Sequence, residues 1–138
     1  MSSLSLEIVT AQRTLLAETS IQRAKIATSF GYMGAEPGHA PLLAVLVPGI
    51  LEYTKIDGEI EEFYVNGGIV EVQKNKVTVL ADEGLRTDEL DAKAIEKAEA
   101  SARAIADSSD SAPMDKTAAL ATLSALAIQR QMLKKRGH

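Results

Sequence analysis

The stretch that decides the fold reads Gly31-Tyr32-Met33-Gly34-Ala35-Glu36-Pro37-Gly38-His39-Ala40-Pro41-Leu42-Leu43. Its glycines and prolines force the chain to reverse at fixed places, because glycine accepts unusual backbone angles and proline fixes φ. We expect a tight turn at Gly31-Tyr32-Met33-Gly34 and a loop that continues to His39. Three large side chains lie in or directly before this stretch: Phe30, Tyr32 and Met33. They either cover one end of a small β-domain or contact another protein.

On both sides of this stretch, apolar and polar residues alternate as they do in strands with one buried face, for example in residues 4–8. Residues 50–56 and 60–65 flank Asp57-Gly58, which is a two-residue hairpin signal. Lys74-Asn75 marks a second short reversal, between residues 70–73 and 76–80. Many short strands separated by turn signals predict an antiparallel β-sandwich over residues 1–86.

The apolar period changes near Gly84 and becomes helical. Asp88 is placed to cap a helix over residues 89–107, and the break at residues 107–113 precedes a second helix over about 114–136 that Gly137 is placed to end. A short connection between two helices predicts an antiparallel hairpin, so we expect a mainly β plus α fold with a hairpin domain at residues 87–138. Its seam is expected at Leu90, Ala94, Ala98, Ala102 and Ile105, and at Leu123, Leu126, Ala127, Arg130 and Leu133.

A seam made mainly of alanine buries little apolar area, so it stabilises helix packing far less than a seam of leucine does. We therefore expect local helices that pack weakly on each other and on the sandwich. Weak packing is what a movable element requires.

The composition narrows the functions open to this chain of 138 residues. Its net charge of −4 disfavours general nucleic-acid binding, and the lack of cysteine removes disulfides and thiolate chemistry. No apolar run approaches the roughly 20 residues that span a bilayer, and no secretory signal is visible. We therefore expect a cytoplasmic protein that reaches a membrane only through other proteins.

The charge is unevenly distributed, because no acidic residue follows Asp115. A basic end on an acidic protein indicates either an acidic partner or residues that complement the dipole of the last helix. The basic residues concerned are Arg130, Lys134, Lys135 and Arg136.

No catalytic or metal-binding pattern stands out. Gly31-x-x-Gly34 lacks the Gly-Lys-Ser or Gly-Lys-Thr ending of a phosphate loop. His39 has only His138 and no cysteine with which to share a metal ion. We expect no catalytic residue, no metal and no cofactor, and an enzyme that uses His39 is kept as an alternative hypothesis.

Four motifs follow one another in a fixed order, and together they resemble the epsilon subunit of bacterial F-type ATP synthase. They are Pro37-Gly38-His39-Ala40-Pro41-Leu42-Leu43, Pro48-Gly49, the run from Glu62 to Val72, and Val77-Thr78-Val79-Leu80-Ala81-Asp82. The resemblance implies a non-catalytic central-stalk subunit that couples proton-driven ring rotation to ATP synthesis. It implies a sandwich that binds the gamma subunit and the ring of c subunits, peripherally on the cytoplasmic face of the bacterial inner membrane.

The resemblance also implies roles for individual residues. It makes Gly31-Tyr32-Met33-Gly34 and the loop to His39 the ring-facing end. It implies that the hairpin extends along the shaft and inhibits ATP hydrolysis, with the basic tail meeting an acidic loop of the beta subunit in the alpha/beta catalytic head. The tail consists of Arg130, Lys134, Lys135 and Arg136.

Some members of the family bind ATP through an Ile/Leu-Asp-x-x-Arg-Ala motif. This chain keeps Leu90 and Asp91 but has Ala94 at the arginine position. Because alanine cannot donate to a phosphate, we expect weak or absent ATP binding. The alternative to the whole interpretation is an unrelated β-sandwich adaptor whose helical hairpin binds another protein.

Overall fold

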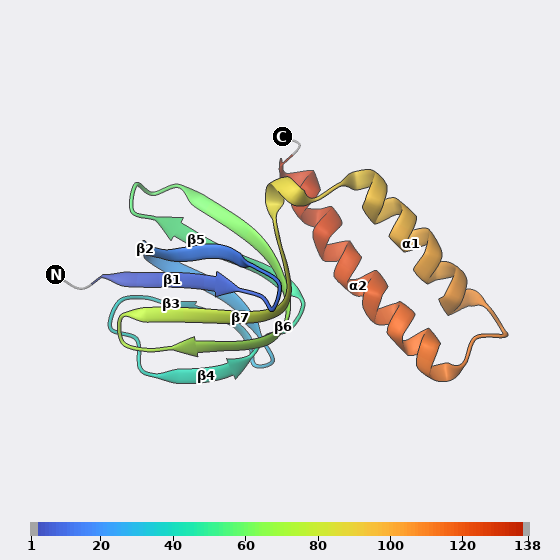
Figure 1. Ribbon diagram of the computed structural model, residues 1–138, viewed down its shortest axis with the longest axis horizontal. Coiled ribbons are helices and arrows are strands. Elements are labelled where there is room, and N and C mark those ends of the chain that lie inside the picture. Colours follow the sequence, from blue (N-terminus) through green and yellow to red (C-terminus); the bar gives the residue numbers. More distant parts are fainter. Residues whose placement is uncertain (1–2, 137–138) are drawn as a thin grey trace. The chain divides into compact units, whose positions relative to one another are not determined.

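The computed structural model describes residues 3–136 and divides the chain into two units, residues 1–86 and 87–138 (Figure 1). The first unit contains strands β1 (Leu4–Val9), β2 (Thr14–Thr28), β3 (Gly31–Ala35), β4 (Leu42–Val45), β5 (Gly49–Lys55), β6 (Ile60–Val72) and β7 (Lys76–Arg86). The second contains a 3-10 turn, η1 (Thr87–Glu89), and helices α1 (Ala92–Asp107) and α2 (Pro113–Arg136). The predicted fold class, a β-sandwich followed by two helices, is confirmed.

The strands are ordered β1-β7-β6-β5-β2-β3, β4 pairs with β6, and β1 also pairs with β2. Five strands, β1, β7, β6, β5 and β2, therefore form a closed ring of pairings. A ring with an odd number of strands cannot keep every pair antiparallel. The parallel pair is β1 with β7, with Leu6 opposite Val77, so the expectation of a wholly antiparallel sandwich is corrected at this one seam.

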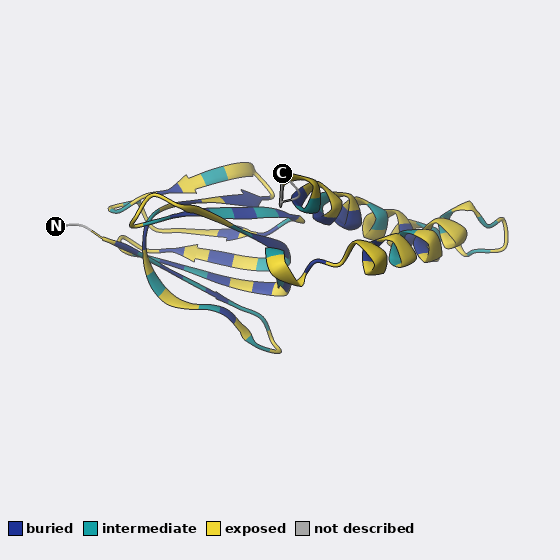
Figure 2. Ribbon diagram, turned by 90° about the horizontal axis from the view of Figure 1, so that it is seen from above, coloured by how far each residue is buried: buried dark blue, intermediate teal, exposed yellow. Residues whose placement is uncertain are grey.

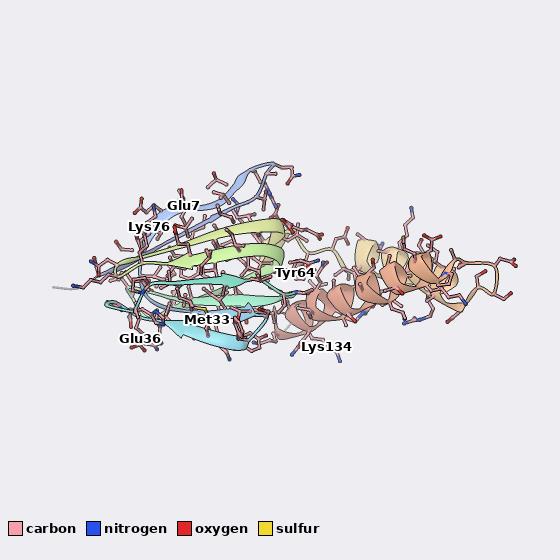
Figure 3. The ribbon with its side chains drawn as sticks, turned by 90° about the horizontal axis from the view of Figure 1, so that it is seen from below. Glu7, Met33, Glu36, Tyr64, Lys76 and Lys134 are labelled. Atoms are coloured by element: carbon pink, nitrogen blue, oxygen red, sulfur yellow. The ribbon has the colours of Figure 1, made fainter. Side chains whose placement is uncertain are left out.

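Charged side chains form ion pairs between β7, β1 and β2, where the ring of strand pairings closes. The Nζ atom of Lys76 on β7 lies 3.7 Å from Oε1 of Glu7 on β1 and 3.6 Å from Oε2 of Glu18 on β2 (Figure 3). All three side chains are partly exposed, so these ion pairs add little stability. The buried apolar side chains between the strands are the main source of stability.

Burial alternates along the strands of the sandwich, as the dark blue and yellow bands in Figure 2 show. Leu4, Leu6 and Ile8 are fully buried, which confirms the period-two pattern of residues 4–8. Each aliphatic side chain of this kind contributes about 1.5–3 kcal/mol on burial. The core also includes Leu15, Ile21, Ile26, Leu51, Phe63, Val65, Val70, Val72, Val77 and Val79.

The turn predicted at Gly31-Tyr32-Met33-Gly34 is wrong, because these residues lie in strand β3. The chain reverses at Ser29-Phe30, and Thr28 pairs with Gly31. The hydroxyl of Thr28 donates to the Gly31 carbonyl at 2.7 Å and accepts from the Phe30 N–H at 3.2 Å. A threonine side chain thus closes the turn, and only Gly31 uses glycine's freedom there, with φ of 107°.

The two predicted hairpins are present, but one loop differs from the expectation. Lys74-Asn75 connects β6 to β7, and the Gln73 N–H donates to the Lys76 carbonyl at 2.7 Å. The Asp57-Gly58 hairpin has three loop residues instead of two, because the Lys55 N–H donates to the Glu59 carbonyl at 2.7 Å. Gly58 has a φ of 93°, which is the usual conformation of glycine at the end of a three-residue loop.

Helix α1 begins three residues later than predicted. Its N-cap is Asp91, whose carboxylate accepts a hydrogen bond from the Lys93 N–H at 3.0 Å, whereas Asp88 lies in η1. Pro113 is the first residue of α2, a position where its missing N–H costs nothing. Gly137, expected to end α2, lies outside the described residues.

The buried face of the hairpin agrees only in part with the predicted seam. Leu90 and Ala102 are buried as predicted, but Ile95 is buried as well, and Ala94 and Ile105 are exposed. On α2, Leu126 is buried as predicted and Ala127 is exposed. The apolar pattern does not single out one face of α1, because alanine occurs on every side of this helix.

Candidate interaction surfaces

The two aromatic residues near the turn between β2 and β3 face solvent. Phe30 is 89% exposed and Tyr32 is 59% exposed, while Met33 packs against the core. The Nζ atom of Lys25 lies 4.9 Å from the centroid of the Tyr32 ring, within cation–π range. Of the two interpretations left open by the sequence, covering a domain end fits Met33, and a contact surface fits Phe30 and Tyr32.

The structure does not bring His39 together with the rest of the predicted ring-facing loop. Phe30 precedes β3, whereas His39 follows the other end of that five-residue strand, which spans roughly 16 Å. The loop of His39 is instead tied to the β6–β7 turn, since the Gly38 N–H donates to the Lys74 carbonyl at 2.8 Å. The predicted surface is therefore two separate surfaces.

His39 takes part in local hydrogen bonding. Its Nδ1 atom lies 2.6 Å from the Ala40 carbonyl oxygen, and its N–H donates to the Glu36 carbonyl at 3.1 Å. A carbonyl oxygen can only accept, so Nδ1 is the donor where this contact is a hydrogen bond. Within residues 3–136, no group of three or more His, Cys, Asp or Glu side chains could hold a metal ion.

An apolar row on the outer face of the sandwich was missed from the sequence. Val45 on β4 lies opposite Ile69 on β6, and Ile69 lies opposite Leu80 on β7. Directly paired residues share a face of the sheet, so the three side chains are neighbours. They are 55%, 38% and 44% exposed, respectively. The sequence does mark these positions, because each of the three residues breaks the alternation of polar and apolar residues by being next to another apolar residue in the chain.

A shallow groove of about 350 Å³ lies over the outer face of β2, β3 and β5. Its charged side chains are Arg23 and Lys25 on β2, Glu52 on β5, and Glu36, which follows β3 and is labelled in Figure 3. Gly34 has no side chain, and no atom beyond its two chain neighbours lies within 4 Å of the position that a Cβ atom would take there. The groove is therefore open at this residue. Two cations and two carboxylates give the groove no net charge with which to select a ligand.

The four basic residues of the predicted tail differ in their surroundings. Arg130 donates from Nε to Oε2 of Glu99 at 3.2 Å and from Nη2 to Oε1 of the same carboxylate. Lys134 and Lys135 are exposed (Lys134 is labelled in Figure 3), and the side chain of Arg136 lies outside the described part of the chain. In the hairpin as described, Arg130 is thus engaged by α1.

The pair formed by Arg130 and Glu99 alters the acidity of both groups. The hydrogen bonds from Arg130 lower the pKa of the Glu99 carboxyl group, and its positive charge acts in the same direction. Glu99 in turn raises the pKa of Arg130, first through the hydrogen bond and then through its charge. Both residues are therefore charged at neutral pH.

The three positions of the degenerate nucleotide motif do not form a polar site. Leu90 is buried, and Ala94 is exposed on α1 without a polar group. The carboxylate of Asp91 is used as the N-cap of the helix that carries the motif.

Among the described residues, no helix is long and apolar enough to cross a membrane.

Chains of two ATP synthase structures are among those that share the fold of this chain. A chain of the Euglena gracilis mitochondrial ATP synthase, in a structure of its OSCP/F1/c-ring assembly, is 24% identical with a TM-score of 0.84, over 96% of this chain and 82% of the other. A chain of the central stalk and c-ring of Tetrahymena thermophila mitochondrial ATP synthase is 19% identical with a TM-score of 0.67, over 93% and 94%. At these identities the likeness is one of fold.

The family comparison is more specific. Residues 3–87, well over half of the chain, match the family described as ATP synthase, Delta/Epsilon chain, beta-sandwich domain. The match covers all seven strands and ends where the helical unit begins. The chain therefore belongs to the ATP synthase delta/epsilon chain family, which supplies a non-catalytic stalk subunit while the catalytic sites lie in other subunits.

Proposed function

We propose that this chain couples the rotation of a proton-driven ring of c subunits to ATP synthesis as the epsilon-type subunit of a rotary ATP synthase. The observation that carries the proposal is the family match over residues 3–87. The likeness to chains from two ATP synthase assemblies, both of which include a c-ring, supports it. A cytoplasmic, peripheral place at the bacterial inner membrane is part of the proposal.

The apolar row of Val45, Ile69 and Leu80 is our proposed contact with the gamma subunit. Exposed apolar side chains that are neighbours on one sheet face form a surface that loses contact with water when a protein partner docks. The row lies on three hydrogen-bonded strands, so binding a partner costs little backbone conformational entropy. A rigid shaft subunit is a suitable occupant for a rigid, flat apolar surface.

The contact with the c-ring is proposed at Phe30 and Tyr32. Both are large and exposed, and Thr28 holds the turn next to them through two hydrogen bonds. Aromatic side chains are enriched where proteins touch other proteins. His39 lies beyond the far end of β3 and is assigned to a different part of the interface.

The helical unit is proposed to inhibit ATP hydrolysis by the alpha/beta head. Its basic residues Lys134, Lys135 and Arg136 would meet an acidic loop of the beta subunit. The alanine-rich composition of α1 supports a hairpin that opens at low cost.

Co-purification with substituted sandwich residues tests the proposal. Ile69→Glu should abolish recovery of the gamma subunit, because it places a charge in the apolar row. Ile60→Glu is the matched control, since Ile60 lies on the same strand and is 58% exposed but is not in the row. If the wild-type chain recovers no gamma, alpha or beta subunit, the adaptor hypothesis replaces this one.

A further inference from the structure

The two helices of the hairpin are joined by an ion pair whose partners are far apart in sequence. Glu99 lies in the middle of α1, and Arg130 lies in the second half of α2, 31 positions later. The guanidinium group contacts both carboxylate oxygens, one through Nε and one through Nη2. A two-point contact of this kind constrains direction as well as distance.

The side chain of Glu99 is more covered than that of Arg130. It is 18% exposed, whereas that of Arg130 is 48% exposed. The pKa of the Glu99 carboxyl group is lowered, first by the hydrogen bond from Arg130, and partial burial opposes this shift. If one helix slid along the other within the packed hairpin, Glu99 would lose its hydrogen bonds to Arg130 while its side chain stayed partly covered.

The apolar part of the seam specifies the register only in part, because three of its buried residues are alanines. The buried residues of α1 are Ile95 and Ala102, and those of α2 are Ala119, Ala125, Leu126, Gln129 and Met132. Alanine methyl groups pack nearly equally well when one helix slides by a turn along the other. A directional polar contact is then the feature that distinguishes one register from its neighbours.

We propose that the Glu99–Arg130 pair is a latch that fixes the register of α1 against α2 and must break before the hairpin can open. The neighbouring charges support it, since Arg103 on α1 favours the ionised form of Glu99 and Glu96 on α1 favours the charged form of Arg130. The latch is a property of the hairpin itself and does not depend on the proposed place in a rotary enzyme.

The latch also gives Arg130 a role different from that of the residues after it. While the pair is closed, Arg130 is held by Glu99 and adds nothing to a cationic tail. When the pair opens, its guanidinium group can bind another carboxylate. Opening of the hairpin and binding of an acidic segment at Arg130 are therefore coupled, each favouring the other.

Distance measurements between spin labels test the latch in the full-length chain. The natural sequence has no cysteine, so Lys97→Cys on α1 and Gln131→Cys on α2 provide the two labelling sites, both at exposed positions. The latch predicts one narrow distance distribution for the parent chain. It predicts a broader distribution that extends to longer distances for Glu99→Gln and for Arg130→Gln.

Two further variants decide the outcome. Glu99→Arg combined with Arg130→Glu should narrow the distribution again in part, because the pair is restored in reverse while Arg103 and Glu96 then face like charges. Arg103→Gln, which removes a neighbouring charge and keeps the pair, should leave the distribution unchanged. Narrow distributions in both single variants, no recovery in the exchanged pair, or equal broadening by Arg103→Gln would each overturn the latch.

Discussion

The hydroxyl group of Tyr53 on β5 donates a hydrogen bond to Oε2 of Glu61 on β6 at 2.8 Å. The Tyr53 ring is almost fully buried and stacks on Phe63, with the ring centroids 6.0 Å apart. Burial raises the pKa of Tyr53 above its ordinary value of 10.0, and the hydrogen bond and the charge of Glu61 raise it further. The neutral phenol is thus the form that the folded sandwich requires.

This relationship predicts a loss of stability at alkaline pH. Because the pKa of Tyr53 is higher in the folded chain than in the unfolded chain, its contribution is fully present below the ordinary value of 10.0. The contribution is lost as the pH rises above that value, where the unfolded chain releases the proton first. Urea unfolding at pH 8 and pH 11 should show the decrease in the free energy of unfolding.

Tyr53→Phe separates this contribution from other alkaline effects. The variant should lose about 1 kcal/mol of stability at pH 8, because one hydrogen bond is removed and Glu61 remains hydrated. Its free energy of unfolding should then fall less than that of the wild type between pH 8 and pH 11. Tyr32→Phe, at an exposed position, is the control, and an equal pH response in all three chains would contradict the prediction.

Gly68 is the position where a side chain is least tolerated. Its φ is 99°, and an added Cβ atom would overlap the backbone carbonyl of Leu80 on the neighbouring strand. We expect Gly68→Ala to cost about 2–4 kcal/mol, since backbone strain and steric overlap add. Gly34→Ala is the matched control in β3, because open space surrounds that position, and it should change the unfolding free energy by less than about 0.5 kcal/mol. Similar urea midpoints for the two variants would refute this account.

The strand-rich half could be predicted from the sequence because its alternation is strong and local. Leu4, Leu6 and Ile8 reveal one face of β1 without any knowledge of the partner strands. The parallel pairing of β1 with β7 could not be predicted in this way. It depends on how many strands close the ring, and no local pattern reports that number.

The candidate surfaces were harder to predict than the fold. Glycine density located the turn region, but Thr28 fixes the turn through its side chain, so Tyr32 and Met33 lie in a strand. The sequence could not predict the pairing of Arg130 with Glu99 either, because Arg103, four residues later on the same helix, is an equally suitable partner for Glu99 by spacing. Contacts between helices depend on their rotation, which the alanines of α1 leave undefined.

The degenerate nucleotide motif leads to a prediction about ligand binding. Ala94 has no donor for a phosphate group, and Asp91 is engaged by the Lys93 N–H as the helix cap. Calorimetric titration of the purified chain with ATP should therefore show no binding at micromolar concentrations. Ala94→Arg is the informative variant, because a gain of binding would show that only the donor is missing. Micromolar affinity in the unmodified chain would contradict the prediction.

Removal of the hairpin tests the inhibitory role of the second unit. A chain that ends at Arg86 keeps every strand of the sandwich. It should bind the gamma subunit as the full chain does and should raise the rate of ATP hydrolysis by a reconstituted catalytic head. An unchanged rate with normal gamma binding would show that residues 87–138 are not inhibitory in this protein, and the coupling role would stand.

The basic tail and the latch should respond differently to substitution. Replacing Lys134, Lys135 and Arg136 by Gln should weaken docking to an acidic loop by roughly tenfold, since three ion pairs with that loop would contribute about 0.5 kcal/mol each. This change should relieve part of the inhibition and should matter less as salt is raised, because exposed charges are screened. Arg130→Gln should instead increase the inhibition of ATP hydrolysis, because loss of the pair with Glu99 frees the hairpin to extend and so favours the inhibitory state. Steady-state hydrolysis rates measured across a salt series distinguish the two, and identical effects of both variants at every salt concentration would show that Arg130 belongs to the tail after all.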